Sequence, residues 1–429
     1  MASEVTAFRD VLFFAIGGGW GSEQADEKHN AAVSVIRGTD FARLKSCDVA
    51  DVPRRFESAS KAGKRALQEG DIVLEISGGS PSRGQTTGRT FFVDQGTLNS
   101  LPGIAIPASF CRLVRVDREK IVPRFAYYWL QEMYLSGRAG EYENQSTGIS
   151  NFQFERFLDA EAIALPPLDQ QQQIEKLLGS LDDRIDLLRQ TNTTLEAIAQ
   201  TLFNSWFVDF EPVRAMADGR EPEGMDAATA ALFPSEFEES ELGLIPKEWR
   251  VGTLLDLLEL QRGFDLPATQ RVPGAYPIIA ASGPAGTHAE AKVQGPGIVT
   301  GRSGVLGKVF LELEDFWPLN TTLWIKNYSA CGPCYAYELL RRIDFQQFNA
   351  GSAVPTLNRN HVHGLPQLLP PQEAIQAFEL IALSMHRRVH ANSVQVQLLS
   401  EIRDTLLPRL ISGKLRLPEA EKSIEDAVA

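Results

Sequence analysis

Two short motifs are the strongest candidates for reactive or metal-binding chemistry in this chain. Cys331-Gly-Pro-Cys334 has the spacing of dithiol redox sites, where one thiol at a helix start has a lowered pKa, and a helix is expected from Tyr335. However, no βαβ pattern surrounds the pair, and no second cysteine pair completes a zinc site. His361 and His363 could form a metal pair on one strand face, but no third ligand is evident. We therefore predict that both motifs are structural.

Other catalytic signatures are missing from the sequence. Gly17-Gly18-Gly19 does not match a phosphate-binding P-loop, and no GxGxxG follows a strand-like run. There is no Asn-Pro-Pro-aromatic or Asp-Pro-Pro-aromatic tetrapeptide, which an amino-methyltransferase would be expected to carry. No Ser-His-Asp set or pair of catalytic carboxylates can be placed. The four cysteines do not suggest a disulfide framework in a chain of 429 residues. The sequence therefore favours binding over catalysis.

A strand followed by a polar, glycine-rich loop occurs twice. Ser77–Gly88 follows the strand-like GDIVLEI, and Gly297–Val309 contains a second strand and loop, GIVTGRSGVLGKV. Because both stretches have a strand followed by a glycine-rich loop, they indicate a duplicated unit. The aligned segments are Ile72-Val73 with Ile298-Val299, Ser77-Gly78 with Ser303-Gly304, and Gln145–Phe152 with Gly351–Asn358.

Two long helices with a continuous seam must position these loops. From Asp169 to Trp206, mostly apolar residues recur at alternating gaps of four and three, the spacing that keeps one stripe of a helix facing a partner. The same spacing recurs 204 residues later, and each stretch follows Leu-Pro-Pro. The seams are Ile174, Leu178, Leu181, Ile185, Leu188, Asn192, Leu195, Ala199, Leu202 and Trp206, and then Phe378, Ala382, Met385, Val389, Asn392, Val396, Leu399, Arg403, Leu406 and Leu410.

The seams predict an antiparallel helix pair. Parallel packing is disfavoured because a second globular part must fit between the end of the first helix and the start of the second. With full antiparallel overlap, Asn192 faces Asn392. A polar residue at a seam position costs stability but specifies the register, so we predict that these two side chains pair.

The net charge of −13 is unevenly distributed. Phe207–Leu242 holds ten acidic and two basic residues, and we interpret Val208–Leu242 as a solvated linker. The globular parts on either side are nearly neutral, so local basic loops are compatible with the composition. The sequence contains no run of about 18 apolar residues, so no membrane span is predicted. The N-terminus lacks a basic leader and a cleavage signature. We expect a cytoplasmic protein.

These features resemble type I restriction–modification specificity subunits over essentially the whole chain. LPPLDQQQQIEKLLGSLDDRIDLLRQTNTTLEAIAQTLFNSWFVDFEPVRA is similar to the central conserved region of that family. ELGLIPKEW resembles the opening of its second target recognition domain, and LLPRLISGKL resembles its terminal conserved region. GDIVLEISG and GIVTGRSG resemble the strand and loop of its recognition domains. The second helix departs from the pattern with QEAIQAF, where an acidic-Gln pair is usual.

The resemblance implies an α+β fold with two pseudo-repeated α/β target recognition domains joined by two long antiparallel coiled-coil helices. The expected segments are target recognition domain 1 (1–168), a central conserved helix (169–207), an acidic linker (208–242), target recognition domain 2 (243–370), a distal conserved helix with a tail strand (371–417) and a flexible tail (418–429).

The resemblance also implies a function. Each globular domain would read one half of an asymmetric bipartite site in double-stranded DNA, and the helices would set the spacing and dock two methyltransferase subunits, through which motor-nuclease subunits bind. S-adenosylmethionine, ATP and Mg²⁺ would be bound by those partners, and this chain would hold no cofactor or metal and would not be catalytic. The residues predicted to contact bases and phosphates are Arg83, Gln85, Thr86 and Arg89 in the first domain and Arg302, Ser303 and Lys308 in the second, with Lys64 and Arg65 as further phosphate contacts.

Three other interpretations are compatible with the sequence. A structural coiled-coil scaffold would have no sequence-specific DNA affinity, although it leaves the two matching basic loops unexplained. A redox enzyme built on Cys331 and Cys334 would lose its activity when both are changed to serine. A stand-alone DNA-binding protein would need no methyltransferase to bind tightly. For each predicted DNA contact, the alternative is an ordinary surface side chain.

Overall fold

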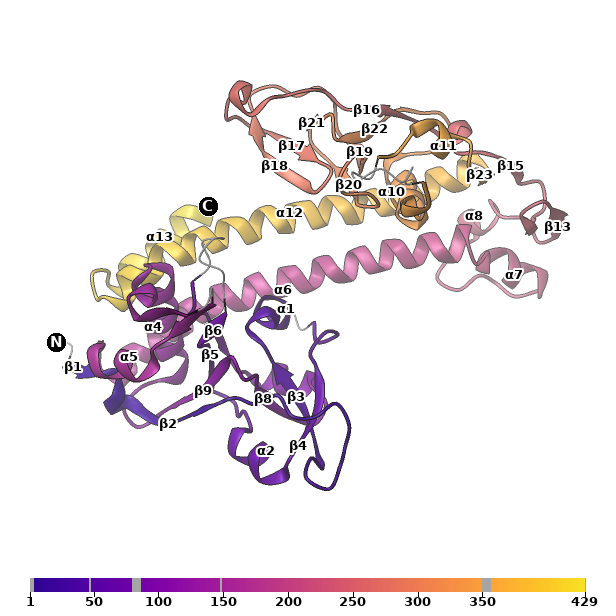
Figure 1. Ribbon diagram of the computed structural model, residues 1–429. Coiled ribbons are helices and arrows are strands. Elements are labelled where there is room, and N and C mark those ends of the chain that lie inside the picture. Colours follow the sequence, from indigo (N-terminus) through magenta and orange to yellow (C-terminus); the bar gives the residue numbers. More distant parts are fainter. Residues whose placement is uncertain (1–3, 46–47, 79–85, 147–148, 349–355, 429) are drawn as a thin grey trace. The chain divides into compact units, whose positions relative to one another are not determined.

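The computed structural model describes residues 4–45, 48–78, 86–146, 149–348 and 356–428 (Figure 1). The chain divides into two compact units. One consists of Met1–Gln190 with Ser393–Ala429, and the other consists of Thr191–Asn392. Both boundaries fall inside long helices, α6 (Leu168–Phe207) and α12 (Gln372–Ile411), so each unit contains part of both helices. Among the described ranges, no helix combines the length and apolar character that crossing a membrane requires.

The first unit contains two main sheets and two smaller ones. The largest is antiparallel, with the order β2 (Leu12–Gly17), β9 (Cys111–Val116), β5 (Ile72–Glu75), β7 (Thr90–Phe92). The next has the order β4 (Arg54–Glu57), β3 (Ala31–Ile36), β8 (Ile104–Pro107), with β3 and β8 parallel. The smaller sheets are β10 (Glu143–Ser146), β11 (Ile149–Phe152), β6 (Ser77–Gly78) and the pair β1 (Glu4–Ala7), β12 (Ala162–Leu165).

The second unit repeats this topology. Its largest sheet has the order β16 (Leu258–Arg262), β22 (Thr322–Tyr328), β19 (Gly297–Gly301), β20 (Val309–Glu312). Its next sheet has the order β18 (Gly283–His288), β17 (Tyr276–Ala280), β21 (Trp317–Pro318), again with one parallel pair, β17 and β21. β15 (Arg250–Thr253) pairs with β23 (Pro366–Leu369) as β1 pairs with β12. The predicted internal repeat is therefore a repeat of strand order and direction.

The central strands β5 and β19 explain why the repeat could be recognised in the sequence. All their residues are buried, and both contain Ile-Val, aligned as predicted. Strands covered on both faces need continuous apolar side chains, so this stretch stays recognisable while the surrounding loops differ.

In the first unit, the seam halves of α6 and α12 pack into one core. Leu181, Ile185 and Leu188 are buried in the same cluster as Leu399 and Leu406. α4 (Pro123–Leu135) begins with a proline at its first turn and buries Trp129, which stacks on Phe8 at 5.1 Å. The charged seam position Arg403 is satisfied by Asp182, at 2.8 Å.

In the second unit, aromatic residues dominate the helix contacts. Phe203 of α6 meets Phe378 of α12 with ring centroids 5.7 Å apart, and Tyr335 of α10 (Pro333–Arg342) lies 5.0 Å from Phe207. Because the end of α6 meets the beginning of α12, the helices are antiparallel in this unit, as the seams predicted.

The predicted asparagine pair is present in the second unit. Asn392 is 2% exposed, and its Nδ2 donates to Asn192 Oδ1 at 2.8 Å. The Nδ2 of Asn192 in turn donates to the carbonyl of Val389 at 3.2 Å. A buried amide is costly without partners, so this pair favours the one register in which the two residues face each other.

The prediction that 208–242 is a solvated linker is wrong for its apolar residues. The segment forms α7 (Glu211–Ala217), α8 (Ala227–Ala230) and a hairpin of β13 (Phe237–Ser240) with β14 (Gly243–Pro246). Val213 and Phe233 are buried in the core of the second unit, and Phe233 lies 5.3 Å from the ring of Trp206. Acidic residues such as Glu221 and Glu223 are exposed, so the segment's charge count concealed its buried face.

The predicted tail strand and flexible end are also wrong. Leu417–Val428 forms a helix, α13, in which Ala420 is fully buried and Leu417 and Ile424 pack on the first unit's core. These residues are spaced three and four apart, which places them on one helix face.

Candidate nucleic-acid interface

In the first unit, the start of the predicted DNA-reading loop is held by two neighbouring segments. The backbone amides of Ile76 and Ser77 both donate to the carbonyl of Phe110, at 2.9 and 3.2 Å. Phe152 N donates to the carbonyl of Ile76 at 2.8 Å, and the hydroxyl of Ser77 donates to Asn151 Oδ1 at 2.8 Å. The loop therefore leaves the sheet between the start of β9 and the end of β11.

The second unit holds its loop in the same way. The amides of Arg302 and Ser303 both donate to the carbonyl of Thr321, at 2.8 and 3.0 Å, and Leu357 N donates to the carbonyl of Arg302 at 2.8 Å. Ser303 thus corresponds to Ser77, as predicted. Leu357 occupies the place of Phe152, so the predicted match of Gln145–Phe152 with Gly351–Asn358 is shifted by one residue. The backbone pairing fixes this register, and the loop sequences are too different to reveal it.

The predicted contacts of the first loop are only partly within the described residues. Arg83 and Gln85 lie outside them, as does Cys47, and Thr86 is half-buried. Arg89 forms a bidentate ion pair with Glu75, with Nε and Nη2 at 2.7 and 2.6 Å from its two oxygens. This hydrogen bonding raises the pKa of Arg89, while 40% of the side chain stays exposed. The pair joins the end of β5 to the returning strand and fixes the base of the loop.

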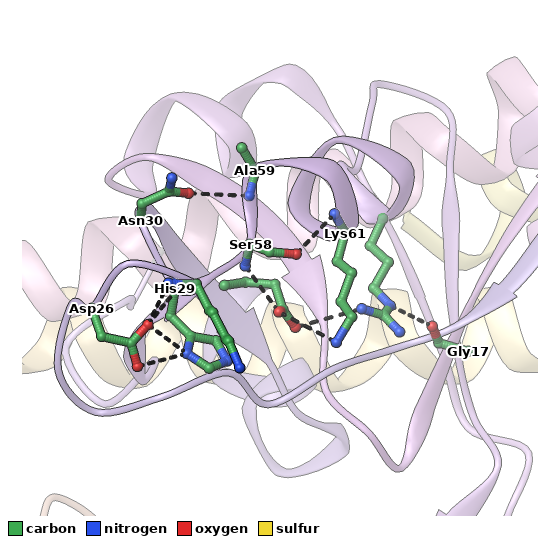
Figure 2. Close-up of polar contacts among 10 residues, drawn as sticks. Gly17, Asp26, His29, Asn30, Ser58, Ala59 and Lys61 are labelled. Carbon is green, nitrogen blue, oxygen red and sulfur yellow. Dashed lines mark hydrogen bonds and ion pairs between the residues drawn. The ribbon is translucent and has the colours of Figure 1, made fainter.

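Lys64 and Arg65 lie at the end of α2 (Ala59–Arg65). Ser58 caps this helix by accepting from the amide of Lys61 at 3.4 Å (Figure 2). Arg65 is turned inward, and its Nε donates to the carbonyl of Gly17 at 3.0 Å, whereas Lys64 is exposed. Of the two, only Lys64 extends freely into solvent.

In the second unit, a short polar network lies at the start of the loop. Arg302 donates to the carbonyl of Asn320 at 3.4 Å, and the amide of Asn320 donates to Asp265. Ser303 is half-buried beside this network, and Lys308 is exposed at the far end of the loop. The structure thus brings Arg302 and Ser303 together with Asn320 and Asp265, two residues that the sequence alone did not single out.

Comparisons with known proteins agree with this architecture. Residues 56–197 match the model of the Type I restriction modification DNA specificity domain. The type I restriction enzyme HindI specificity subunit of Haemophilus influenzae is 25% identical over 454 residues, covering 89% of this chain and 92% of that protein. This chain is similar to type I restriction–modification specificity subunits. The MjaIX specificity subunit of Methanocaldococcus jannaschii is 22% identical, covering 71% and 72% of the two chains.

A solved structure has a similar fold. The crystal structure of the type I restriction–modification system S subunit from M. genitalium superposes with a TM-score of 0.61, covering 95% of both chains at 14% identity. At that identity the similarity concerns the fold, namely two mixed α and β parts with two long helices.

The Cys331–Cys334 motif of this chain has a structural role. Cys331 donates to the carbonyl of Leu257 at 3.3 Å, and burial raises its pKa to about 12. Burial also raises the pKa of Cys334, so neither thiol is activated. The carboxylate of Glu379 accepts from the amides of Cys334 and Tyr335, at 2.8 and 3.0 Å, and caps the start of α10. No sequence pattern indicated this cap, because Glu379 comes from another helix, α12.

The histidine motif does not have the predicted strand geometry. His361 and His363 lie on a short helix, α11 (Arg359–His363), and His363 Nε2 accepts from the amide of Leu260 at 2.8 Å. Within the described part of the chain, no three His, Cys, Asp or Glu side chains are close enough to hold a metal ion.

Proposed function

We propose that this chain is the sequence-specificity subunit of a type I restriction–modification complex. Each globular part would read one half of an asymmetric bipartite site in double-stranded DNA. The observation that carries the proposal is the repeated topology: both units hold a loop at the same place, by the same backbone hydrogen bonds from Ile76 and Ser77 or from Arg302 and Ser303.

The asymmetry of the site follows from the differences between the loops. A pair of identical reading surfaces selects two equivalent half-sites, as in dimeric DNA-binding proteins. Here the frame is repeated but the side chains differ, because Ile76 in one unit corresponds to Arg302 in the other. We therefore expect two half-sites of different sequence. Loop residues that contact base edges would determine the sequence, and basic residues such as Lys64 and Lys308 would hold phosphates.

The two long helices would set the spacing between the half-sites and dock two methyltransferase subunits, with motor-nuclease subunits joining through them. Under this proposal the chain itself is non-catalytic and works in the cytoplasm, where its DNA substrate is. S-adenosylmethionine would be bound by the methyltransferase subunits, and ATP and Mg²⁺ would serve cleavage in the partners. The Cys331–Cys334 pair needs no catalytic role, because its thiols have raised pKa values and lie at a helix cap.

Mapping of DNA methylation tests this proposal. Cells carrying the chain with the methyltransferase encoded beside it are compared with cells lacking only this chain. We expect a split, asymmetric adenine motif that is present only with the chain, and the motif would give both half-sites and their spacing. If a pair shown to form a complex produces no difference in methylation, the proposal fails and the structural scaffold becomes the better interpretation. Tight, specific DNA binding by the isolated chain would instead favour the stand-alone DNA-binding protein.

A further inference from the structure

Corresponding positions beside the two loops can be assigned from the backbone. In the first unit, Gly18 N donates to the carbonyl of Cys111 at 2.9 Å, and Gly19 N donates to that of Pro107 at 2.9 Å. The same two bonds recur in the second unit, from Gly263 to Thr322 at 3.0 Å and from Phe264 to Pro318 at 2.8 Å. Phe110 therefore corresponds to Thr321, whose carbonyl accepts the equivalent pair of loop amides, and Trp20 corresponds to Asp265.

The structural task of this position is carried by its carbonyl group. Both Phe110 and Thr321 accept two amides from the loop start, although their side chains have nothing in common. The fold therefore does not require a phenyl group at residue 110. The Phe110 side chain nevertheless remains 62% exposed, next to the predicted reading loop. An exposed aromatic ring gains little from folding, and aromatic residues are enriched where proteins contact their partners.

The surface beside Phe110 is aromatic and apolar. Trp20, at the neighbouring corresponding position, is 40% exposed, with the guanidinium of Arg55 at 5.0 Å from its ring. Ile76 begins the loop on the other side of Phe110, because β9 lies between β2 and β5 in the sheet. The corresponding surface of the second unit is polar: Thr321 takes the place of Phe110, Asp265 that of Trp20, and Arg302 that of Ile76.

We propose that Phe110 is a specificity-determining residue that makes an apolar contact with base edges in one half-site. This inference rests on the proposed function and adds the chemistry of the contact. The group on a base pair suited to such a contact is the C5-methyl of thymine, which is exposed in the major groove. In the second unit, Thr321 and Arg302 carry hydrogen-bonding side chains at the same place, and arginine pairs with guanine. The hydroxyl of Thr321 also accepts from the amide of Ala281, at 3.4 Å. The first half-site would thus depend on apolar contacts at a position where the second depends on hydrogen bonds.

The test compares methylation motifs of the intact chain, Phe110→Thr, Phe110→Leu and Phe13→Thr, each expressed with the neighbouring methyltransferase. Phe13 is the matched control, because it is 71% exposed in the same unit but sits at a bulge of β2. We expect Phe110→Thr to reduce discrimination by roughly tenfold at one or two adjacent positions of one half-site, a typical effect of losing one base contact. Phe110→Leu should lose less, and Phe13→Thr should leave the motif unchanged.

The outcomes separate this inference from the proposed function. If the intact chain produces a split motif and Phe110→Thr produces the same motif with the same efficiency, the inference is wrong and the function stands. A uniform loss at all positions, with unchanged thermal unfolding, also overturns it, because a phosphate contact carries no sequence information. If the intact chain produces no motif, the proposed function fails and the inference fails with it.

Discussion

The cap formed by Glu379 allows a substitution whose effect should reverse sign between two backgrounds. Gly332 precedes α10 with φ −105° and ψ 175°, a conformation that alanine adopts without strain. A Cβ at this position would lie 2.3 Å from the carboxyl carbon of Glu379. Gly332→Ala must therefore displace the Glu379 side chain, which then loses its hydrogen bonds to the amides of Cys334 and Tyr335.

The expected magnitude follows from these two bonds. Hydrogen bonds to a charged group contribute about 1.5–3 kcal/mol, and a carboxylate at a helix N-terminus adds about 0.3–1 kcal/mol. Since both bonds share one half-buried carboxylate, we expect Gly332→Ala and Glu379→Ala each to cost about 2–3 kcal/mol. In the Glu379→Ala background the collision is gone, and Gly332→Ala should stabilise by about 0.4–1 kcal/mol because alanine restricts the unfolded chain.

Urea unfolding of the full chain, combined with hydrogen exchange of peptides from α10, measures both effects. Exchange assigns the change to the second unit, which matters because a chain with two units need not unfold in one step. Additive costs of the two substitutions, or a cost of Gly332→Ala that persists unchanged without Glu379, would refute the reasoning.

Three further substitutions have expected outcomes. Asn392→Leu removes the donor to Asn192 and should lower the free energy of unfolding by about 1–3 kcal/mol, as measured in urea. Changing both asparagines to leucine should recover most of that loss. An equal loss in the single and the double variant would contradict this expectation. Changing Cys331 and Cys334 to serine should leave the methylation motif unchanged, and a lost motif would revive a chemical role for the pair. Burial, with a contribution from Asp182, raises the pKa of Asp186 to about 6. Since this lies above its unfolded value, the folded state binds more protons between pH ~4 and ~6, and Asp186 costs stability at neutral pH. Asp186→Asn should therefore stabilise by about 1–2 kcal/mol at pH 7.5, and the gain should vanish near pH 4, which urea midpoints at the two pH values would show.

The predictions that succeeded rest on periodic or repeated side chains. The helix seams, the antiparallel Asn192–Asn392 contact and the equivalence of Ser77 with Ser303 each depend on spacing that a packed interface demands. The predictions that failed concern short segments whose apolar residues are few. Phe233 in the acidic segment and Ala420 in the tail are buried by partners distant in the sequence, and local charge outweighed them in the sequence pattern.

By itself, the sequence determined that this chain has two similar parts, two long helices and an antiparallel seam, because buried strands and helix stripes demand apolar residues at fixed intervals. Tertiary structure alone decided which side chains surround each loop. Phe110 and Thr321 became comparable through shared backbone hydrogen bonds, and Glu379 became a helix cap through the packing of α12 on α10. Such contacts join residues far apart in the chain, and at least one partner in each is a backbone N–H or C=O group that almost every residue type carries. No pattern of side chains therefore predicts them.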